Sequence, residues 1–325
     1  MKIQRKQLFK GSAPTARNAI IDGQTTVKGH SLMQKLIASS RGVTLWTQSF
    51  GRPENPSVLL VMGAMNQGIF WPDEFCEGLV AAGFYVVRYD HRDTGKSSRI
   101  DFQTNPYDLH SLTDDAVDVI RSYGLGRPTV IGLSMGGYIA QLLATSYPDV
   151  LGGMVLISST ADHRPYMAAT MGKSTAGFSL PGPEQSYLDC VMAASVNPPQ
   201  TLSSILQSMS EGWRVTYGGP RPYPKVQVER ALHLALQRAP DIAAAFHHGL
   251  AVAASPDRLQ LITRIAVPTL VVHGRYDPLL PLAHGQYLAS NIKNAQFEVL
   301  EMGHSFMWSW DSEILMRVLK FMRSK

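Results

Sequence analysis

Six continuous apolar runs follow one another from residue 58 onward, and stretches with helical periodicity separate them. A strand that is buried on both faces gives a continuous apolar run, whereas an amphipathic helix repeats its apolar residues every three to four positions. The runs cover residues 58–62, 84–89, 129–133, 154–158, 269–273 and 296–300, and the helical stretches cover residues 72–82, 112–123, 135–147, 281–291 and 311–321. The alternation predicts an α/β fold with a mostly parallel central sheet and helices on both faces.

Two parts of the chain depart from this alternation. Residues 35–39 and 43–50 have the pattern of two short strands joined by a turn at Arg41 and Gly42, which predicts an antiparallel edge of the sheet. Between about residues 161 and 256, methionine, proline, glycine and serine are frequent, with helical patches and no clear buried strand. An insertion of this size predicts a cap over the carboxyl edge of the sheet, where open α/β sheets bind ligands. We therefore expect a core of residues 39–160 and 257–325, with a cap or lid at 161–256.

Charge is concentrated at the amino terminus. The chain has a net charge of +5, and residues 1–28 hold six Lys and Arg against one Asp, which leaves 24 basic and 24 acidic residues in the remainder. Residues 1–38 are thus expected to be a basic N-terminal extension. The balanced remainder gives no reason to expect nucleic acid as a partner. No apolar run approaches the roughly 18 residues of a membrane span, and the first residues lack the apolar core of a secretory signal, so we expect no integral membrane association and a cytoplasmic location. The oligomeric state, monomer or homodimer, stays open.

The segment Gly132-Leu133-Ser134-Met135-Gly136 carries the strongest chemical signal. It directly follows a predicted buried strand and directly precedes a predicted helix, which is the setting of a nucleophile elbow. The turn exposes the serine hydroxyl at the sheet edge, and the flanking glycines avoid collisions with the neighbouring backbone. The backbone N–H of Met135 and the helix dipole would face any negative charge that develops there. Ser134 is therefore the candidate nucleophile.

A serine nucleophile needs a base to take its proton and a carboxylate to orient that base. Where the serine lies in such an elbow, the order along the chain is serine, acid and then base. Asp277 comes after the run at 269–273, and His304 comes after the run at 296–300. Because both follow the carboxyl ends of strands, they are expected at the same rim as Ser134. No metal and no organic cofactor is expected, because the chain supplies nucleophile, base and oxyanion donors and shows no metal-ligand cluster.

Other polar residues at strand ends remain alternatives. Asp162 follows the run before the cap and could be the acid instead of Asp277. His273 precedes Asp277 and fits a core or supporting position better than a catalytic one. His247 and His248, in the expected cap, either touch substrate or lie on a solvated helix face. In the segment of residues 90–97, His91 could be catalytic, but a loop-shaping role is expected for its neighbour Arg92.

These motifs, with their repeated local matches over about residues 43–325, resemble the α/β-hydrolase family and, within it, the aclacinomycin methylesterase group. The matching segments are residues 61–63, 71–75, 88–95, 132–136, 180–183, 277–278, 284–285 and 303–304. The resemblance implies that the second oxyanion donor is a backbone N–H in the loop after residues 58–62, and Ala64 is the expected donor. Most relatives have His-Gly at the start of this loop, where this chain has Met62 and Gly63.

The resemblance implies hydrolysis of a carboxylic ester through an acyl-enzyme, with a methyl or other small-alcohol ester of a bulky molecule as the substrate. The same triad could also act on a carbon–carbon bond, thioester, lactone or peroxyacid. A ligand-binding receptor built on a hydrolase fold is the non-enzymatic alternative, and stoichiometric binding without turnover would favour it.

Overall fold

A computed structural model describes residues 23–27, 30–239 and 241–324, and within them one mixed sheet organises the molecule. The nine strands are arranged in the order β1-β2-β3-β5-β4-β6-β7-β8-β9. The pairs β1–β2, β2–β3 and β3–β5 are antiparallel, and the remaining pairs are parallel. Their bounds are β1 Gly23–Val27, β2 His30–Ala38, β3 Thr44–Phe50, β4 Ser57–Val61, β5 Tyr85–Tyr89, β6 Thr129–Leu133, β7 Gly153–Ile157, β8 Thr269–Gly274 and β9 Gln296–Leu300. The predicted mostly parallel sheet is confirmed, with each of its six apolar runs forming a strand.

The antiparallel edge extends further toward the amino terminus than the sequence indicated. The predicted strand at 35–39 begins in the structure at residue 30, and β1 pairs with it as the outermost strand. Residues 23–27 and 30–38 therefore belong to the sheet, although they fall in the segment expected as an extension. Residues 1–22, which hold most of the basic excess, lie outside the described residues.

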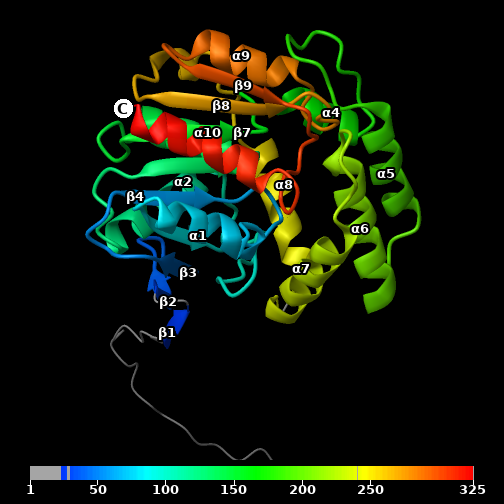
Figure 1. The fold of residues 1–325 in the computed structure, drawn as a ribbon. Helices are drawn as coiled ribbons and strands as arrows, with labels where there is room; N and C mark the ends of the chain where they lie inside the picture. The colour runs from blue at the N-terminus through cyan, green and yellow to red at the C-terminus, as the bar shows by residue number, and fades with distance from the viewer. Residues whose placement is uncertain (1–22, 28–29, 240, 325) are drawn as a thin grey trace, which may run out of the picture.

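Helices cover the two faces of the sheet. Alternate strand residues point to opposite sides, so Leu59 and Val61 join one apolar cluster while Val58 and Leu60 join the other. The first cluster holds α2 Leu109–Ser122, α3 Met135–Ser146 and α9 Ala283–Asn291, and the second holds α1 Asp73–Ala81 and α10 Asp311–Arg323. Figure 1 shows α1 and α10 side by side over one face. Each of these five helices overlaps one of the predicted helical stretches.

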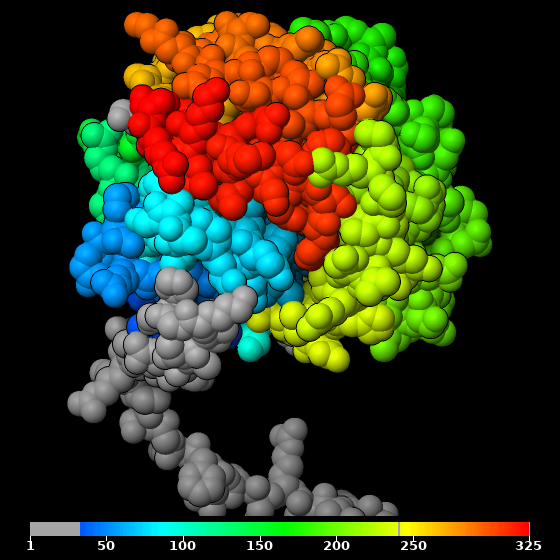
Figure 2. Space-filling model, in the orientation of Figure 1, coloured from blue at the N-terminus to red at the C-terminus, as the bar shows by residue number. Residues whose placement is uncertain are grey.

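The region expected as a cap is helical in its described part. It contains α4 Arg164–Thr170, α5 Gln185–Val196, α6 Leu202–Tyr217, α7 Lys225–Arg238 and α8 His247–Ala253. Helices α5 to α7 are grouped at one side of the sheet (Figure 1). On the face in Figure 2, the surface of this group lies directly against the core. Helix α8 is different, because its residues Ala251 and Val252 belong to the same apolar cluster as α2 and α3. The last part of the region predicted as cap thus packs into the core.

Within the described residues, every helix is too short or too polar to cross a bilayer.

Candidate active site

Ser134 lies at the junction of β6 and α3 in a strained backbone conformation. Its φ of 52° and ψ of −117° are rare for any residue other than glycine. A side chain at Gly132 would collide with the backbone of Gly136, and one at Gly136 would collide with the backbone of Val61. The glycines that flank the serine in the sequence are therefore required by close packing between β4, β6 and α3. The turn directs Ser134 into a cavity at the carboxyl edge of the parallel strands.

His304 and Asp277 are joined by a hydrogen bond. Nδ1 of His304 lies 2.8 Å from Oδ2 of Asp277, and His304 lines the same cavity as Ser134. The other carboxylate oxygen, Oδ1, accepts the backbone N–H groups of Leu279 at 2.9 Å and Leu280 at 3.0 Å. Burial opposes ionisation of Asp277, but the nearby His304 and these hydrogen bonds outweigh it and lower the pKa of the carboxyl group. The arrangement keeps Asp277 charged and His304 oriented.

The loop that carries His304 is bound to the end of α6. Backbone N–H groups of Gly303 and His304 each donate to a carbonyl oxygen at the C-terminal end of that helix, at 2.8 Å, from Tyr217 and Thr216 respectively. The last turn of a helix leaves carbonyl groups without intrahelical partners, and this loop satisfies two of them. The position of His304 therefore depends on α6 as well as on β9.

The alternative acid, Asp162, is held by a different partner. Its carboxylate accepts two side-chain hydrogen bonds from Arg164, both at 2.7 Å, and the backbone N–H of the same residue at 3.0 Å. Burial opposes ionisation, but these bonds outweigh it and lower the pKa of Asp162. Of the two aspartates, Asp277 is the one that the structure brings to His304.

The other strand-end histidine, His273, supports the loop of Asp277. It is fully buried, and its Nε2 donates to the carbonyl oxygen of Leu280 at 2.7 Å. Burial also lowers its pKa. The core or supporting position expected for His273 agrees with these contacts.

The cavity has a volume of about 300 Å³ and its lining contains no Asp, Glu, Lys or Arg. Besides Ser134 and His304, its walls come from residues 62–66 after β4, from α3, from α4 to α6, from α8 and from the loops after β8 and β9. Six methionines line it, together with three tyrosines and one tryptophan: Met62, Met65, Met135, Met167, Met209, Met307, Tyr138, Tyr166, Tyr187 and Trp213. Methionine side chains adapt to varied apolar shapes. The cavity is therefore suited to a bulky, uncharged, largely apolar group.

The two expected oxyanion donors, Ala64 and Met135, both line the cavity. No protein acceptor takes the N–H of either one within the described part of the chain. The next N–H in the loop, that of Met65, is already taken by Nδ1 of His248 at 2.9 Å. Gly63 lies against Ser134, because a Cβ built on it would be 3.4 Å from the serine Cβ. Within the described residues, the N–H groups of Ala64 and Met135 thus lack a protein acceptor, and both residues line the same cavity as Ser134.

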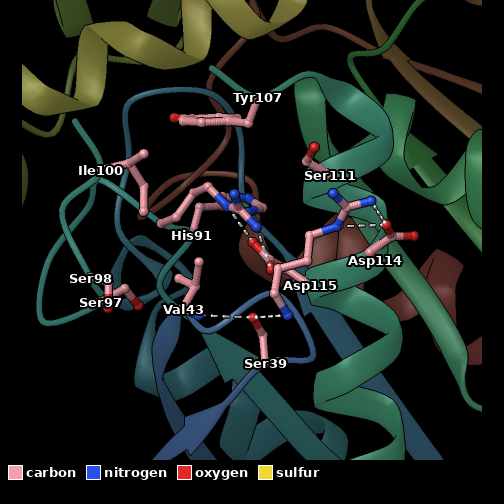
Figure 3. A network of polar contacts seen from close by, with 12 residues as sticks. Ser39, Val43, His91, Ser97, Ser98, Ile100, Tyr107, Ser111, Asp114 and Asp115 are labelled. Atoms are coloured by element: carbon pink, nitrogen blue, oxygen red, sulfur yellow. Dashed lines mark hydrogen bonds and ion pairs between the residues drawn. The ribbon is translucent and has the colours of Figure 1, made fainter. Parts of the chain in front are cut away.

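The segment of residues 90–97 ties α2, α7 and α8 together. Arg92 makes a two-bonded ion pair with Asp115, with both distances 2.7 Å, and Asp115 projects from α2 toward this loop (Figure 3). Asp90 pairs with Arg238 at the end of α7 at 2.6 Å. Asp93 accepts from Tyr107 at 2.8 Å and lies 3.1 Å from His247. The loop-shaping role expected for Arg92 agrees with these contacts.

For His248, both expectations are wrong, and for His247 the expected contact with substrate is not seen. His248 is completely buried and His247 is partly buried against Asp93, and neither lines the cavity. The reason is that α8 packs inward, so His248 faces the loop of residues 90–97 instead of solvent or substrate. His91 is also fully buried and does not line the cavity, and its Nε2 donates to the carbonyl oxygen of Met62 at 3.0 Å.

The sequence interpretation missed His163, which lines the cavity directly before α4. Burial and the neighbouring charge of Arg258 together lower the pKa of His163 to about 4, so the ring is neutral at neutral pH. Its place just after a strand end was a signal that could have found it. The tyrosines of α4 and α5, Tyr166 and Tyr187, hydrogen-bond to each other at 2.8 Å, and their place in the cavity depends on cap packing that no local pattern reveals.

Known proteins resemble this chain over most of its length. The Alpha/beta hydrolase family matches residues 58–314. Rhodomycin D methylesterase DnrP from Streptomyces peucetius is 35% identical over 271 residues, which cover 81% of this chain and 89% of the relative. 3-Oxoadipate enol-lactonase 2 from Acinetobacter baylyi is 26% identical and covers 82% and 88% of the two chains. The crystal structure of a hydrolase from Pseudomonas aeruginosa is 25% identical, with a TM-score of 0.68, over 89% of this chain and 98% of that one.

Proposed function

The chain belongs to the alpha/beta hydrolase family and is a hydrolase of ester bonds, and we propose that Ser134, His304 and Asp277 form its catalytic triad and that the reaction passes through an acyl-enzyme. The observation that carries this proposal is the 2.8 Å hydrogen bond between His304 and Asp277 beside the cavity that Ser134 lines. The strained turn at Ser134 supports the assignment of the nucleophile.

In the first half of the reaction, Oγ of Ser134 attacks the ester carbonyl carbon while Nε2 of His304 takes the hydroxyl proton. Asp277 accepts a hydrogen bond from the Nδ1–H group of His304 throughout, which keeps the imidazole in the productive tautomer and stabilises its charged form. The N–H groups of Ala64 and Met135 stabilise the negative oxygen of the tetrahedral intermediate. The intermediate then expels the alcohol, which receives the proton from Nε2 and leaves an acyl group on Ser134.

In the second half, water attacks the acyl-enzyme and gives a proton to Nε2 of His304. The second tetrahedral intermediate uses the same two backbone donors. Its collapse breaks the bond between the acyl carbon and the serine oxygen, and the proton returns from Nε2 to the Ser134 oxygen. The acid product leaves, and the free enzyme is restored with no other group consumed.

We propose a methyl or other small-alcohol ester of a bulky, uncharged molecule as the substrate. The similarity to a methylesterase supports the alcohol, and the apolar, methionine-rich lining supports the bulky group. The lactone alternative is weaker for an anionic substrate, because the lining of the cavity supplies no Lys or Arg to pair with its charge.

A fluorophosphonate probe tests this proposal, because it reacts with an activated serine. The probe is expected to label one residue, Ser134, and Ser134→Ala is expected to abolish labelling and lower kcat by roughly 10⁴-fold or more without changing the melting temperature. A screen of esters of graded acyl and alcohol size then defines the substrate class. Labelling at another serine, or full activity of Ser134→Ala, would refute the proposal.

A further inference from the structure

Two buried histidines hold the two ends of residues 62–65, the loop after β4 that we call the oxyanion loop. Nε2 of His91 lies 3.0 Å from the carbonyl oxygen of Met62, and Nδ1 of His248 lies 2.9 Å from the backbone nitrogen of Met65. His91 follows β5 and His248 lies on α8, so the two rings reach the loop from distant parts of the chain. Both are fully buried, and neither lines the cavity.

The two rings also hold each other. They pack edge to face, with centroids 5.6 Å apart and planes at 88°. Nε2 of His248 donates to the carbonyl oxygen of Arg92, the residue after His91, at 2.8 Å. These contacts form a closed circuit: Met65 binds His248, His248 binds Arg92, Arg92 adjoins His91 in the chain, and His91 binds Met62. Movement of the loop would therefore break hydrogen bonds at both ends.

The hydrogen bonds fix which nitrogen of each ring carries the proton. A carbonyl oxygen only accepts, so His91 must carry its proton on Nε2. The N–H of Met65 only donates, so Nδ1 of His248 must be unprotonated. Burial lowers the pKa of His91 to about 4 and that of His248 to about 3, so both rings are neutral at neutral pH, as this pattern requires.

The pinned groups lie on either side of the expected oxyanion donor. The Met62 carbonyl belongs to the peptide between residues 62 and 63, and the Met65 N–H belongs to the peptide between residues 64 and 65. The N–H of Ala64 belongs to the single peptide between them. Peptide groups are planar, so fixing the two outer planes leaves little freedom for the middle one. The loop needs such support, because Met65 has a φ of 65°, which is unfavourable for a residue with a side chain.

We infer that His91 and His248 are positioning residues of the oxyanion hole, which act by fixing the peptide planes on both sides of the Ala64 N–H. This inference rests on the proposed serine mechanism. It assigns to α8 a role in catalysis through hydrogen bonding to the loop, and it assigns no contact between either histidine and the substrate. Loss of either contact lets the Ala64 N–H turn away from the developing negative oxygen, which lowers kcat more than it changes KM.

Paired substitutions test the inference, because asparagine and glutamine carry their amide groups at the positions of different ring nitrogens. Asparagine places its amide near Nδ1, and glutamine places its amide near Nε2. His248→Asn can still accept the Met65 N–H, whereas His248→Gln cannot. His91→Gln can still donate to the Met62 carbonyl, whereas His91→Asn cannot. We expect His248→Asn and His91→Gln to keep kcat within about threefold, and the other two variants to lose about 10- to 100-fold.

The crossed order separates positioning from simple structural support. Loss of packing alone would rank glutamine and asparagine in the same order at both sites, because it depends on side-chain volume. Activity is measured with p-nitrophenyl butyrate, and binding is measured with a trifluoromethyl ketone, which forms a negative oxygen on Ser134. The crippled variants should lose affinity for the ketone in proportion to kcat, with KM changed less than about twofold. His247→Asn is the matched control, because His247 is adjacent to His248 in the chain and contacts Asp93 instead of residues 62–65.

Each possible result has a defined meaning. The same order of asparagine and glutamine at both sites, or unchanged ketone affinity in the slow variants, overturns the inference. Equal melting temperatures of the slow and fast variants exclude unfolding as the cause of the lower kcat. Each histidine has its own pair of asparagine and glutamine variants, so a variant that does not fold at one site leaves the other site as the test. Ser134 labelled by fluorophosphonate in every variant, with kcat unchanged, refutes this inference alone. Wild-type protein that is not labelled at Ser134 refutes the proposed function and this inference with it.

Discussion

Oδ2 of Asp277 accepts from Nδ1 of His304 at 2.8 Å, while Oδ1 of the same carboxylate accepts two backbone N–H groups. Both carboxylate oxygens are thus hydrogen-bonded, and the carboxylate cannot rotate away from the imidazole without breaking several hydrogen bonds. The histidine is held by a residue that is itself held, which is the arrangement that a fixed base requires.

Asp277→Asn should keep the shape of the site but favour the wrong tautomer of His304. We expect kcat to fall by about 10³- to 10⁴-fold. Asp162→Asn is the comparison, because Asp162 is also buried at a strand end but binds Arg164. Its substitution should cost less than about tenfold in kcat. Steady-state kinetics of both variants decide between the two acids, and a crippling Asp162→Asn beside a mild Asp277→Asn would assign the acid to Asp162.

Trp213 should select substrates by size. Its ring lines the cavity and stacks on Phe70, with centroids 5.0 Å apart. Trp213→Ala should lower kcat/KM for esters with a bulky aromatic acid part by about tenfold, because it removes a large apolar contact. For p-nitrophenyl acetate, kcat/KM should change less than about threefold. Trp308→Ala is the matched control, since Trp308 packs against the same rings without lining the cavity. A uniform loss on all esters would argue against a role of Trp213 in specificity.

The sequence predicted best those parts of the fold that are buried on both sides. Residues 129–133 and 154–158 overlap β6 and β7 almost completely, because central parallel strands are covered on both faces and are therefore largely apolar. The outer strands were harder to predict, since β1 carries Gln24, Thr25 and Thr26 and has no continuous apolar run. The elbow and the acid and base candidates follow from motifs at strand ends, which is a local signal.

The contacts that hold the oxyanion loop carry no local signal at all. Met65 and His248 are 183 positions apart, and only the inward packing of α8 brings them together. The same is true of Tyr166 and Trp213, which reach the cavity only through the tertiary packing of α4 and α6. A histidine on a short helix is compatible with solvent, substrate or core, and tertiary structure alone decides among them.

Removal of Asp115 should destabilise the fold strongly. Its side chain is completely buried in an ion pair with Arg92, whose side chain is 5% exposed. Asp115→Asn leaves a buried guanidinium without its counter-charge, and we expect the free energy of unfolding to fall by about 3 kcal/mol. Chemical denaturation measures this loss.

The neighbouring residue supplies the control. Asp114 lies beside Asp115 on α2 (Figure 3) and pairs with Arg41, whose side chain is 49% exposed. Because water screens such a pair, Asp114→Asn should cost about 1 kcal/mol or less. Equal losses for the two variants would show that burial of the Arg92 pair contributes nothing special.

Asp311 should make the protein less stable as the pH rises through the neutral range. It begins α10, and its Oδ1 is buried without a hydrogen-bond partner within the described residues. Burial, with a smaller contribution from the charges of Glu74 and Glu313, raises the pKa of Asp311 to about 7 despite backbone hydrogen bonds that lower it. An unfolded aspartate has a pKa of about 3.9.

The folded chain therefore keeps this proton between about pH 4 and pH 7, where the unfolded chain has lost it. Stability falls with rising pH wherever the folded state binds more protons, so the contribution of Asp311 is complete below about pH 4 and is lost as the pH passes 7. Asp311→Asn removes this titration and leaves all other groups unchanged. The melting temperature of the variant relative to wild type should thus be higher at pH 8 than at pH 5, with exposed Asp149→Asn as the control. A difference that is equal at the two pH values would mean that Asp311 is ionised in the folded protein throughout.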